Sequence, residues 1–426
     1  MRYLQGFGDS TTNESFNALV LHHDRLRQHN HEGGHRVQCV FAFDPQCRAN
    51  ERAATGWRRS VSGQAPDGQT PQRGVDQSLG DRCSAIASRW AKTTHVSIEG
   101  TDTHDNSFAG VFEIAGQRVA ITSDGIGTKI DVAERLGRYQ TLGFDLLAMV
   151  VDDLAAIGAR PVAVTNILDV DRLDEAVVDE LMSGLANAAK ACGVVVSGGE
   201  IAQLGDRIGG YGEGMHFNWA ATAIGTAHSE ANGSWRGRLC EGDVIVSIAS
   251  DGFRSNGFSM ARRILADLFG DAWHDVRSET GRPWGEVLLQ PARIYAPGII
   301  GIPEHERVVH GAVHVTGGGV PGNLARLLDG TGLGAELDDL WPPHAEMLEL
   351  CRDGAVSAAD AYGQWNMGNG MLLVVAADDE TRVLDSLSGA GYRVRSAGRI
   401  VRSPQIVLDA TAWGFGELTV STGDPQ

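Results

Sequence analysis

The stretch Ile121–Lys129, ITSDGIGTK, predicts a strand that ends in a glycine turn, and the rest of the chain is interpreted outward from it. An apolar run leads a strand to its end at Asp124, and Gly125 and Gly127 allow turn geometries that larger residues resist. The turn therefore brings a carboxylate, a hydroxyl, an ammonium group and bare amides to one spot. Because magnesium takes oxygen ligands and phosphates need donors, this set is typical of a magnesium and nucleotide site.

The turn is a weak signal by itself, because solvated β-turns of this composition are common. Its lysine is nevertheless unusual in this chain, where only three of the 36 basic residues are lysine. The stretch matches neither the P-loop pattern GxxxxGKS/T nor the dinucleotide pattern GxGxxG. A solvated turn and a nucleotide site are both open at this point.

The composition is that of a globular protein without a polyanionic partner. With 426 residues, 42% of them hydrophobic, the chain is long enough for two medium domains. Its net charge of −18 argues against nucleic acid or a membrane surface as a partner. No apolar run reaches the ~18 residues of a membrane span, and the N-terminus lacks a secretory signal. Six cysteines without CxxC spacing predict reduced thiols in a cytoplasmic protein, with neither disulfides nor a zinc site.

The first 73 residues differ in composition from the rest. They carry nine arginines against seven acidic residues, and residues 48–73 are rich in Gly, Pro, Gln, Ser and Arg. We expect residues 1–73 to be a disordered extension; a histidine tract that binds metal and a wrongly assigned start codon are the alternatives. The other expected divisions are an N-terminal domain over 74–235, a C-terminal domain over 236–412 and a tail over 413–426.

Strands and helices alternate along the ordered part, with glycine turns between them. The apolar periodicity predicts strands over 109–116, 117–125, 161–169 and 244–249, and helices over 141–158, 173–192 and onward from Asn256. A strand that ends in glycines and an acid is expected at 194–200, a strand, glycine triplet and helix at 313–328, and a turn leading into a strand at 362–375. This alternation indicates an α/β protein of two domains that meet near Ser229–Glu241.

The predicted helix over 141–158 carries three aspartates. Asp145 and Asp152 are seven residues apart and share a face, whereas Asp153 points about 100° away. Burial of an unpaired carboxylate is costly. The aspartates therefore either form a solvent-facing edge or bind a metal beside Asp124.

Eight motifs, in order, resemble the aminoimidazole ribonucleotide synthetase family, the phosphoribosylformylglycinamidine cyclo-ligases of purine synthesis. The resemblance runs from about Gly74 to Asp409, and its strength lies in the order, because each motif alone is weak. The motifs are GVDxxxG at Gly74, SDGIGTK at Asp124, TLGFDLLAMVVDDLAAIGARP at 141–161, SGGE at Glu200, SNGF at Asn256, PxRIY at 291–295, HVTGGG at His314 and NMGNGM at Asn366.

The resemblance implies a two-domain α/β (α+β) fold whose N-terminal sheet domain forms a barrel in a homodimer, followed by a C-terminal α/β domain. It also implies ATP and Mg²⁺ as cofactors and a small nucleotide as substrate. The implied metal ligands are Asp124, Asp153 and Glu200, and the implied ATP and phosphate contacts are Gly125, Gly127, Thr128, Lys129, Gly198 and Gly199. The implied substrate contacts are Ser255, Asn256, Thr316, Gly317, Gly318, Gly319 and Asn366. The implied catalytic residues are Asp124, Lys129 and His314; His314 is either an acid or base or merely a hydrogen-bonded side chain.

The implied reaction is the ATP-dependent cyclisation of formylglycinamidine ribonucleotide to aminoimidazole ribonucleotide, with release of ADP and phosphate. An amide oxygen is a poor leaving group, so the γ-phosphoryl of ATP is transferred to it before a ring-forming nitrogen attacks. The chain departs from the family pattern at NSFAG (106–110), at DGFRSNG (251–257), where Arg254 replaces the usual histidine, and at GQWNMG (363–368). These departures leave open a related enzyme for another amide or phosphate acceptor, such as a thiamine-monophosphate kinase, or a non-catalytic nucleotide-binding homologue.

Overall fold

The computed structural model describes residues 82–83, 86–87, 108–227 and 238–422. These residues belong to one compact unit of the chain, Pro71–Gln426. The expected extension over 1–73, the GVDxxxG motif and most of the expected domain boundary lie outside the described residues.

A five-stranded sheet contains the quoted turn. Its strands are β1 (Gly110–Ile114), β2 (Gln117–Gly125), β3 (Arg160–Val170), β4 (Val195–Gln203) and β5 (Phe217–Thr226). They lie in the order β1-β2-β5-β3-β4; β3 and β4 pair in parallel and the other neighbours are antiparallel. Parallel neighbours need a crossover connection, and helix α4 (Glu175–Cys192) supplies it.

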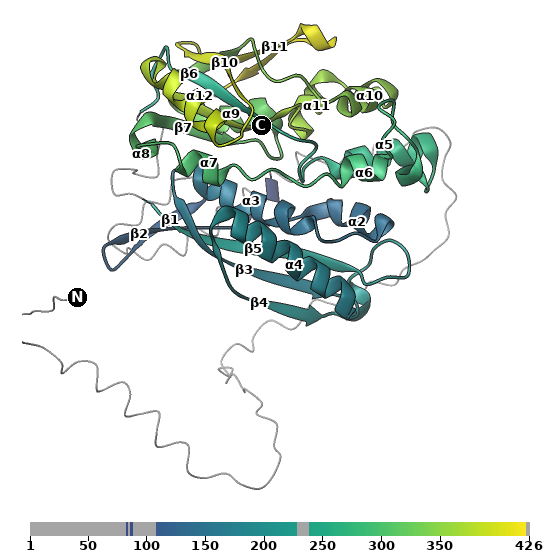
Figure 1. Cartoon of the computed structure of the whole chain (residues 1–426). Helices are drawn as coiled ribbons and strands as arrows, with labels where there is room; N and C mark the ends of the chain where they lie inside the picture. The colour runs from purple at the N-terminus through teal and green to yellow at the C-terminus, as the bar shows by residue number, and fades with distance from the viewer. Residues whose placement is uncertain (1–81, 84–85, 88–107, 228–237, 423–426) are drawn as a thin grey trace, which may run out of the picture. The chain divides into compact units, whose positions relative to one another are not determined.

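Helix α3 (Leu142–Ala156) lies between this sheet and the C-terminal part (Figure 1). It packs on α4, β2 and β5, and also on α7 (Ala296–Ile300) and β7 (Val309–His314). Because protein covers it on both sides, its sequence is apolar on nearly every face. Asp145, Asp152 and Asp153 are buried with it, so a solvent-facing aspartate edge is excluded.

The C-terminal half is built on a seven-stranded sheet of order β12-β11-β8-β10-β6-β9-β7. Its other strands are β6 (Val244–Ala249), β8 (Gly334–Leu337), β9 (Asn369–Val375), β10 (Val394–Val401), β11 (Gln405–Ala410) and β12 (Gly416–Ser421). The remaining helices are α2 (Ile130–Leu136), α5 (Phe258–Phe269), α6 (Trp284–Leu288), α8 (His305–Val308), α9 (Gly319–Leu328), α10 (Ala345–Asp353), α11 (Ala358–Gln364) and α12 (Glu380–Gly389). The expected two-domain α/β fold is thus confirmed.

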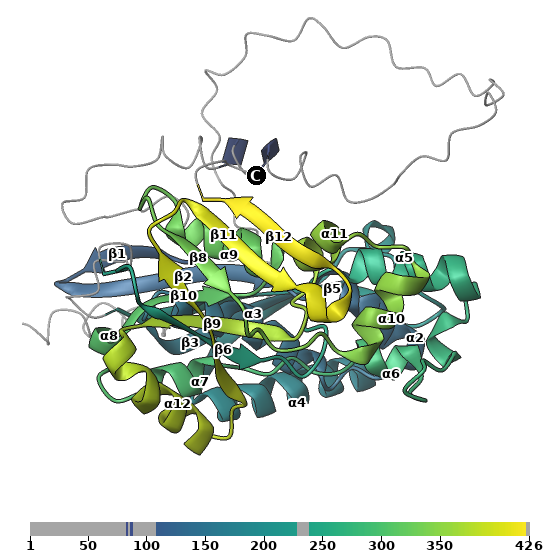
Figure 2. The same cartoon turned by 90° about the horizontal axis from the view of Figure 1, so that it is seen from above.

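Two expectations about the ends of elements are wrong. Strand β4 does not end at Gly198 and Gly199 but continues to Gln203. Gly199 is paired with Asn166 of β3, where there is no room for a side chain. A Cβ atom on Gly199 would lie 2.6 Å from Asn166 Nδ2. The expected tail from residue 413 contains β12, whose apolar residues pack on the core and which pairs with β11 (Figure 2).

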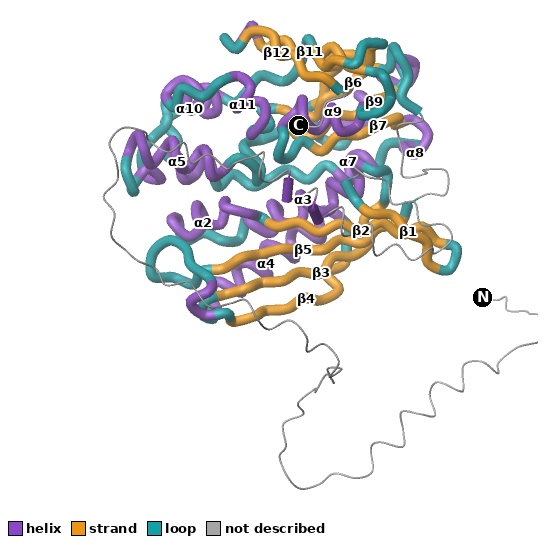
Figure 3. The backbone as a smooth tube through the Cα atoms, turned by 180° about the vertical axis from the view of Figure 1, so that it is seen from behind, coloured by secondary structure: helices purple, strands orange, loops and turns teal. Residues whose placement is uncertain are grey.

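The face of the first sheet that is turned away from α3 carries exposed apolar side chains. Residues paired across strands point to one face, and the register places Ile114, Ile167, Val195 and Ile224 together on it. These side chains are 57%, 52%, 63% and 43% exposed. Figure 3 shows β5, β3 and β4 from this side, with α4 behind them. We call this surface the open face; Glu200, paired with Ile167, belongs to it.

Candidate functional site

Asp124 lies at the end of β2, on the side of the sheet that faces α3. It pairs with Ala221 of β5, which is buried on that side. Its Oδ1 accepts a hydrogen bond of 2.7 Å from the backbone N–H of Gly125. The surrounding protein raises the pKa of Asp124 above its usual 3.8, the Gly125 bond opposes this shift, and the negative charge of Asp153 adds to it.

Asp153 of α3 faces the same region from the helix. Its Oδ1 lies 2.8 Å from His314 Nδ1, and its Oδ2 lies 3.5 Å from the Thr122 hydroxyl. Burial raises the pKa of Asp153 to about 7, although the positive charge of Arg326 opposes this shift. Asp153 is therefore a carboxyl group that lacks full charge compensation from the protein.

The pair formed by Asp124 and Asp153 fits a divalent cation. Burial is the main cause of the raised pKa of Asp124, and a cation between the two carboxylates would remove the smaller contribution from the charge of Asp153. Mg²⁺ is commonly held by one or two carboxylates, with water and phosphate oxygens completing its shell. Since the described residues contain no group of three or more His, Cys, Asp or Glu suited to a metal, the two aspartates would be the protein's share.

Glu200 does not join this pair within one chain. Four residues form a row across the sheet from β2 to β4, namely Asp124, Ala221, Asn166 and Gly199. Glu200 follows Gly199 and therefore points to the opposite face. Three strand spacings, roughly 14 Å, also separate β2 from β4. The implied set of three metal carboxylates is therefore not assembled here.

Lys129 is fully buried, and the protein uses all its donors. Its Nζ donates to Asp145 Oδ1 at 2.7 Å and to the carbonyl oxygens of Arg254 and Gln290 at 3.0 and 2.6 Å. Burial lowers the pKa of Lys129, and the Asp145 carboxylate opposes this shift. An ammonium group has three donors, so none is left for a phosphate. The implied phosphate contact and catalytic role of Lys129 are therefore not supported; Lys129 joins the two halves of the unit.

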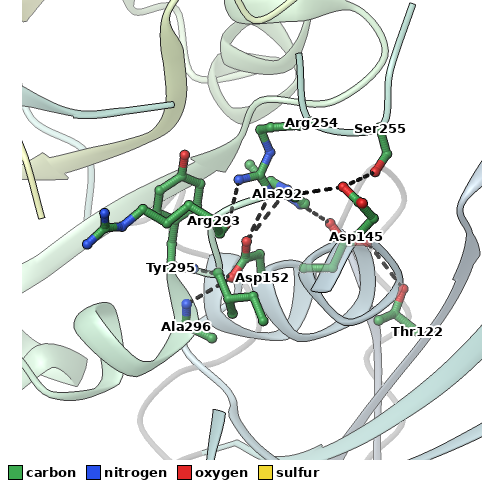
Figure 4. A network of polar contacts seen from close by, with 12 residues as sticks. Thr122, Asp145, Asp152, Arg254, Ser255, Ala292, Arg293, Tyr295 and Ala296 are labelled. Atoms are coloured by element: carbon green, nitrogen blue, oxygen red, sulfur yellow. Dashed lines mark hydrogen bonds and ion pairs between the residues drawn. The ribbon is translucent and has the colours of Figure 1, made fainter. Parts of the chain in front are cut away.

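Asp152 and Arg254 form a second buried ion pair between the halves (Figure 4). Arg254 Nη2 lies 3.0 Å from Asp152 Oδ2, and Asp152 Oδ1 accepts the backbone N–H groups of Tyr295 and Ala296 at 2.7 and 2.8 Å. A buried carboxylate is stable when its oxygens are satisfied in this way. Arg254, which replaces the usual histidine of the family pattern, is thus bound to Asp152.

His314 is fully buried, and both its ring nitrogens are engaged. Nε2 lies 2.8 Å from Arg254 Nη2, and Nδ1 lies 2.8 Å from Asp153 Oδ1. Burial, together with the positive charge of Arg254, lowers the pKa of His314 to about 3. A neutral, enclosed imidazole has no path to a substrate, so the hydrogen-bonded role fits and the acid or base role does not.

The first turn of α5 lies beside the quoted turn. Thr128 Oγ1 is 3.2 Å from Ser259 Oγ in that turn. Helix α5 starts after Gly257, in a left-handed conformation, and no side chain caps it. The buried Nδ2 of Asn256 has no hydrogen-bond partner among the described residues. Uncapped helix amides and a free amide donor fit an anion such as a phosphate.

The glycine triplet 317–319 is less available than expected. Gly318 and Gly319 donate their backbone N–H groups to the carbonyl oxygens of Gly363 and Thr316, at 3.0 and 2.9 Å. A phosphate nest from these two amides is therefore not supported. Gly317 is exposed, and a Cβ on it would lie 3.8 Å from Asn256 Oδ1. Of the triplet, Gly317 is the part that lies beside the candidate anion site.

Asn366 and Ser255 serve the internal structure. Asn366 Oδ1 accepts a bond of 2.9 Å from Ser250 Oγ, and its Nδ2 donates to the carbonyl oxygen of Gly252 at 2.8 Å. Ser255 Oγ lies 3.4 Å from Asp145 Oδ1. Both implied substrate contacts are thus used within the protein.

Comparison with known proteins connects this site to named enzymes. The chain is 34% identical over 336 residues to the phosphoribosylformylglycinamidine cyclo-ligase of Sorangium cellulosum, which covers 78% of this chain and 94% of the relative. The enzyme of the same name from Methanothermobacter thermautotrophicus is 34% identical over 341 residues, 80% of this chain and 96% of the relative. The N-terminal and C-terminal domains of the AIR synthase related proteins match residues 106–227 and 241–410. The chain belongs to the AIR synthase-related family.

Solved structures support the fold of this AIR synthase-related protein. A chain of the HypE-HypF complex superposes with a TM-score of 0.56 at 16% identity, covering 80% of this chain and 100% of that chain. The thiamine-monophosphate kinase of Stenotrophomonas maltophilia gives a TM-score of 0.50 at 20% identity, covering 75% of this chain and 93% of that chain. At such identities the likeness establishes the architecture.

Sequence reasoning missed the contacts that Arg254, Asp145 and Asp152 make in this family member. The available signal was the spacing of the two aspartates, which share one face of an otherwise apolar helix. Several of their partners are more than 100 residues away along the chain, as Arg254 is from Asp152 and Ala292 from Asp145. No local pattern encodes such a pairing.

Proposed function

We propose that this chain converts formylglycinamidine ribonucleotide to aminoimidazole ribonucleotide, with ATP consumed and ADP and phosphate released. The observation that carries the proposal is the pair of aspartates, Asp124 and Asp153, beside an uncapped helix N-terminus. This arrangement stands in a chain that aligns over 94% to 96% of two enzymes named for that reaction. The enzyme is then an ATP-dependent carbon–nitrogen ligase of purine synthesis.

In the proposed reaction the formyl amide oxygen attacks the γ-phosphorus of ATP and ADP leaves. The iminophosphate so formed is attacked at its carbon by the ring-forming nitrogen, and phosphate departs with the former amide oxygen. The chain contributes mainly orientation and charge, as is general for phosphoryl transfer. Since His314 is enclosed, proton movement during ring closure passes through other groups.

Asp124 and Asp153 would hold the Mg²⁺ that accompanies ATP. Bound there, Mg²⁺ would neutralise phosphate charge, which stabilises the transition state of phosphoryl transfer by several kcal/mol. Asp124 comes from a strand end and Asp153 from a helix packed on that strand, so both carboxylates stand on rigid elements. The raised pKa of each is consistent with a site completed by a cation.

The start of α5 would bind a phosphate of the substrate or nucleotide. Asn256 supplies a free amide donor, Thr128 a hydroxyl, and the first turn of the helix its unpaired N–H groups. Gly317 borders the same place without a side chain. We expect these groups to make the contacts that the resemblance implied for Lys129 and for Gly318 and Gly319.

We also propose a homodimer formed through the open face. Ile167, Val195 and Ile224 are each at least 43% exposed there, and exposed apolar patches mark interaction sites. A second copy would cover an identical surface through twofold symmetry. No helix among the described residues is long and apolar enough to cross a membrane. The assignment to purine synthesis favours the cytoplasm.

The test is the release of ADP by the purified protein with ATP and Mg²⁺, with and without formylglycinamidine ribonucleotide, together with the aminoimidazole product. We expect ADP release that depends on the substrate and matches the product one to one. ADP release without product would assign the chain to another acceptor. Nucleotide binding without ADP release would assign it to a non-catalytic homologue.

A further inference from the structure

Four buried side chains form a hydrogen-bonded relay behind the candidate metal site. We call it the relay; it runs from Asp152 through Arg254 and His314 to Asp153. Asp152 Oδ2 lies 3.0 Å from Arg254 Nη2, which lies 2.8 Å from His314 Nε2. His314 Nδ1 lies 2.8 Å from Asp153 Oδ1. Exposed fractions of 0%, 2%, 0% and 8% show that solvent does not replace these bonds.

The chemistry of Arg254 sets the direction of every bond in the relay. A guanidinium group only donates, so His314 Nε2 must accept and carries no hydrogen. The proton of the neutral imidazole is therefore on Nδ1, which donates to Asp153 Oδ1. Arg254 thus determines the tautomer of His314, and His314 determines which oxygen of Asp153 is occupied.

Arg254 is held in one orientation by the C-terminal half. Its Nη1 donates to the carbonyl oxygen of Arg293 at 2.7 Å, and its guanidinium carbon lies 4.6 Å from the centre of the Tyr295 ring. Its backbone has a φ of 61°, which is uncommon for a residue other than glycine and costs free energy. A lysine or histidine at this position could not reach Asp152, His314 and Arg293 together.

The second oxygen of Asp153 is left weakly bound. Oδ2 lies 3.5 Å from Thr122 Oγ1, which is long for a hydrogen bond. The same hydroxyl lies 3.2 Å from the carbonyl oxygen of Phe108, and its single proton favours that shorter bond. Considering the described residues alone, Oδ2 is therefore the less tightly held oxygen of Asp153 and the one that can take a ligand.

We propose that Arg254 and His314 are positioning residues that hold Asp153 Oδ1 and present Oδ2 to the cation bound with the nucleotide. The identity of that cation rests on the proposed function, but its affinity can be measured without turnover. Hydrogen bonds to metal ligands typically change metal affinity by about 10- to 100-fold. The contacts of Arg254 with Asp152 and His314 depend on the arginine at position 254, where the family pattern has histidine.

The test compares Mn²⁺ binding, measured by electron paramagnetic resonance with a non-hydrolysable ATP analogue, in three variants and the full-length wild type. His314→Leu removes both bonds of the ring. His314→Gln keeps one acceptor for Arg254 and one donor for Asp153. His310→Leu is the control, because His310 lies on the same strand, β7, and forms a pair of 2.9 Å with Asp243.

We expect His314→Leu to weaken Mn²⁺ binding by about 10- to 100-fold. We expect His314→Gln to recover most of the affinity and His310→Leu to match the wild type. Melting temperatures of all proteins separate a general loss of stability from a loss of positioning. Wild-type affinity in His314→Leu, equal losses in Leu and Gln, an equal loss in His310→Leu, or no Mn²⁺ binding by the wild type would each overturn the inference. Because no formylglycinamidine ribonucleotide is present, a failed substrate assignment leaves this result intact.

Discussion

At the scale of single residues, the molecule separates carboxylates that bind protein from carboxylates that are free to bind a ligand. Asp145 is neutralised by Lys129 within the N-terminal half, and Asp152 is neutralised by Arg254 across the boundary between the two halves. Within the described part of the chain, Asp124 and Asp153 form no ion pair with Lys or Arg, and their pKa values are raised. Only the second pair therefore has a reason to attract a cation.

Asp124→Asn tests that distinction. The amide keeps the shape of the side chain but removes the charge that would hold the cation, so we expect turnover to fall by roughly 100-fold or more. The melting temperature should stay close to that of the wild type, because Asp124 is exposed at a strand end. Steady-state ADP release and a thermal melt provide the check. Normal turnover would remove Asp124 from the metal site.

Lys129→Met tests the structural role of Lys129. The variant leaves the buried Asp145 without its cation, and breaking a buried pair costs about 3–5 kcal/mol. Denaturant unfolding should show this loss, and adding Asp145→Asn should restore part of it. If the single variant keeps wild-type stability and instead loses ATP affinity, Lys129 contacts the nucleotide after all.

The coupled shifts of Asp153 and His314 predict opposite pH profiles in two variants. The Asp153→Asn variant keeps the lowered pKa of His314, about 3 against an ordinary 6.5. Between about pH 4 and 6.5 the unfolded chain therefore binds more protons at this histidine than the native state does. The contribution of His314 to stability rises with pH over that window. The His314→Gln variant keeps the raised pKa of Asp153, about 7 against 3.8. The native state therefore binds more protons at this carboxyl group than the unfolded chain does. The contribution of Asp153 to stability falls with pH over the same window. Each slope approaches 1.36 kcal/mol per pH unit at most. Unfolding of the metal-free variants and the wild type at several pH values measures the change in slope that each substitution causes, and changes of equal sign would refute the two pKa shifts.

At the scale of elements, helix α3 determines how the two halves are joined. It approaches α4 at a glycine pair: a Cβ on Gly143 would lie 2.2 Å from the carbonyl carbon of Gly184. This close approach fixes the position of α3, and with it the positions of Asp145, Asp152 and Asp153 relative to the sheet. The position of the candidate metal site thus depends on small residues where α3 meets α4.

Gly143→Ala should therefore destabilise the protein and weaken the site. The added methyl group has no room, and overpacking typically costs about 1–3 kcal/mol. Gly322→Ala in α9 is the matched control, because a Cβ there meets nothing within 4 Å. Chemical unfolding and Mn²⁺ affinity of the two variants give the comparison. Equal stability of both variants would show that α3 and α4 can separate without cost.

The sequence was a good guide to elements and a poor guide to their side-chain partners. The helix over 141–158 and the strand over 244–249 were predicted because their apolar patterns are long and regular. The course of β4 was not, because Gly199 is required by its neighbour Asn166 on β3 rather than by a turn. Lys129 and His314 were placed in the site for their chemistry, but their burial depends on contacts with distant segments. Periodicity records exposure along an element and carries no information on such contacts.

At the scale of the whole molecule, the open face is the surface that the described part of one chain leaves uncovered. Its apolar residues lie on one sheet, opposite the side that holds α3 and the candidate metal site. Glu200, the implied metal ligand that one chain cannot bring to Asp124, belongs to this face. A complete enzyme is therefore expected to be larger than one copy.

Ile224→Lys tests the proposed homodimer. Ile224 is 43% exposed on the open face, and a lysine there would be buried against its symmetry mate, so we expect the variant to be monomeric. Leu268→Lys on α5, at the same exposure of 43%, serves as the control and should keep the wild-type mass. Light scattering after size-exclusion chromatography gives both masses. A monomeric wild type, or a dimeric Ile224→Lys, would contradict the proposal.

In the proposed reaction, this chain phosphorylates the formyl amide oxygen of its substrate before ring closure. The most direct test supplies formylglycinamidine ribonucleotide labelled with heavy oxygen at that atom and follows the label by mass spectrometry. We predict one ADP for each aminoimidazole ribonucleotide, with the label in the released phosphate, and a fall of both products by roughly 100-fold or more in Asp124→Asn. Label that stays in the organic product, or ADP release that ignores the substrate, would contradict the account.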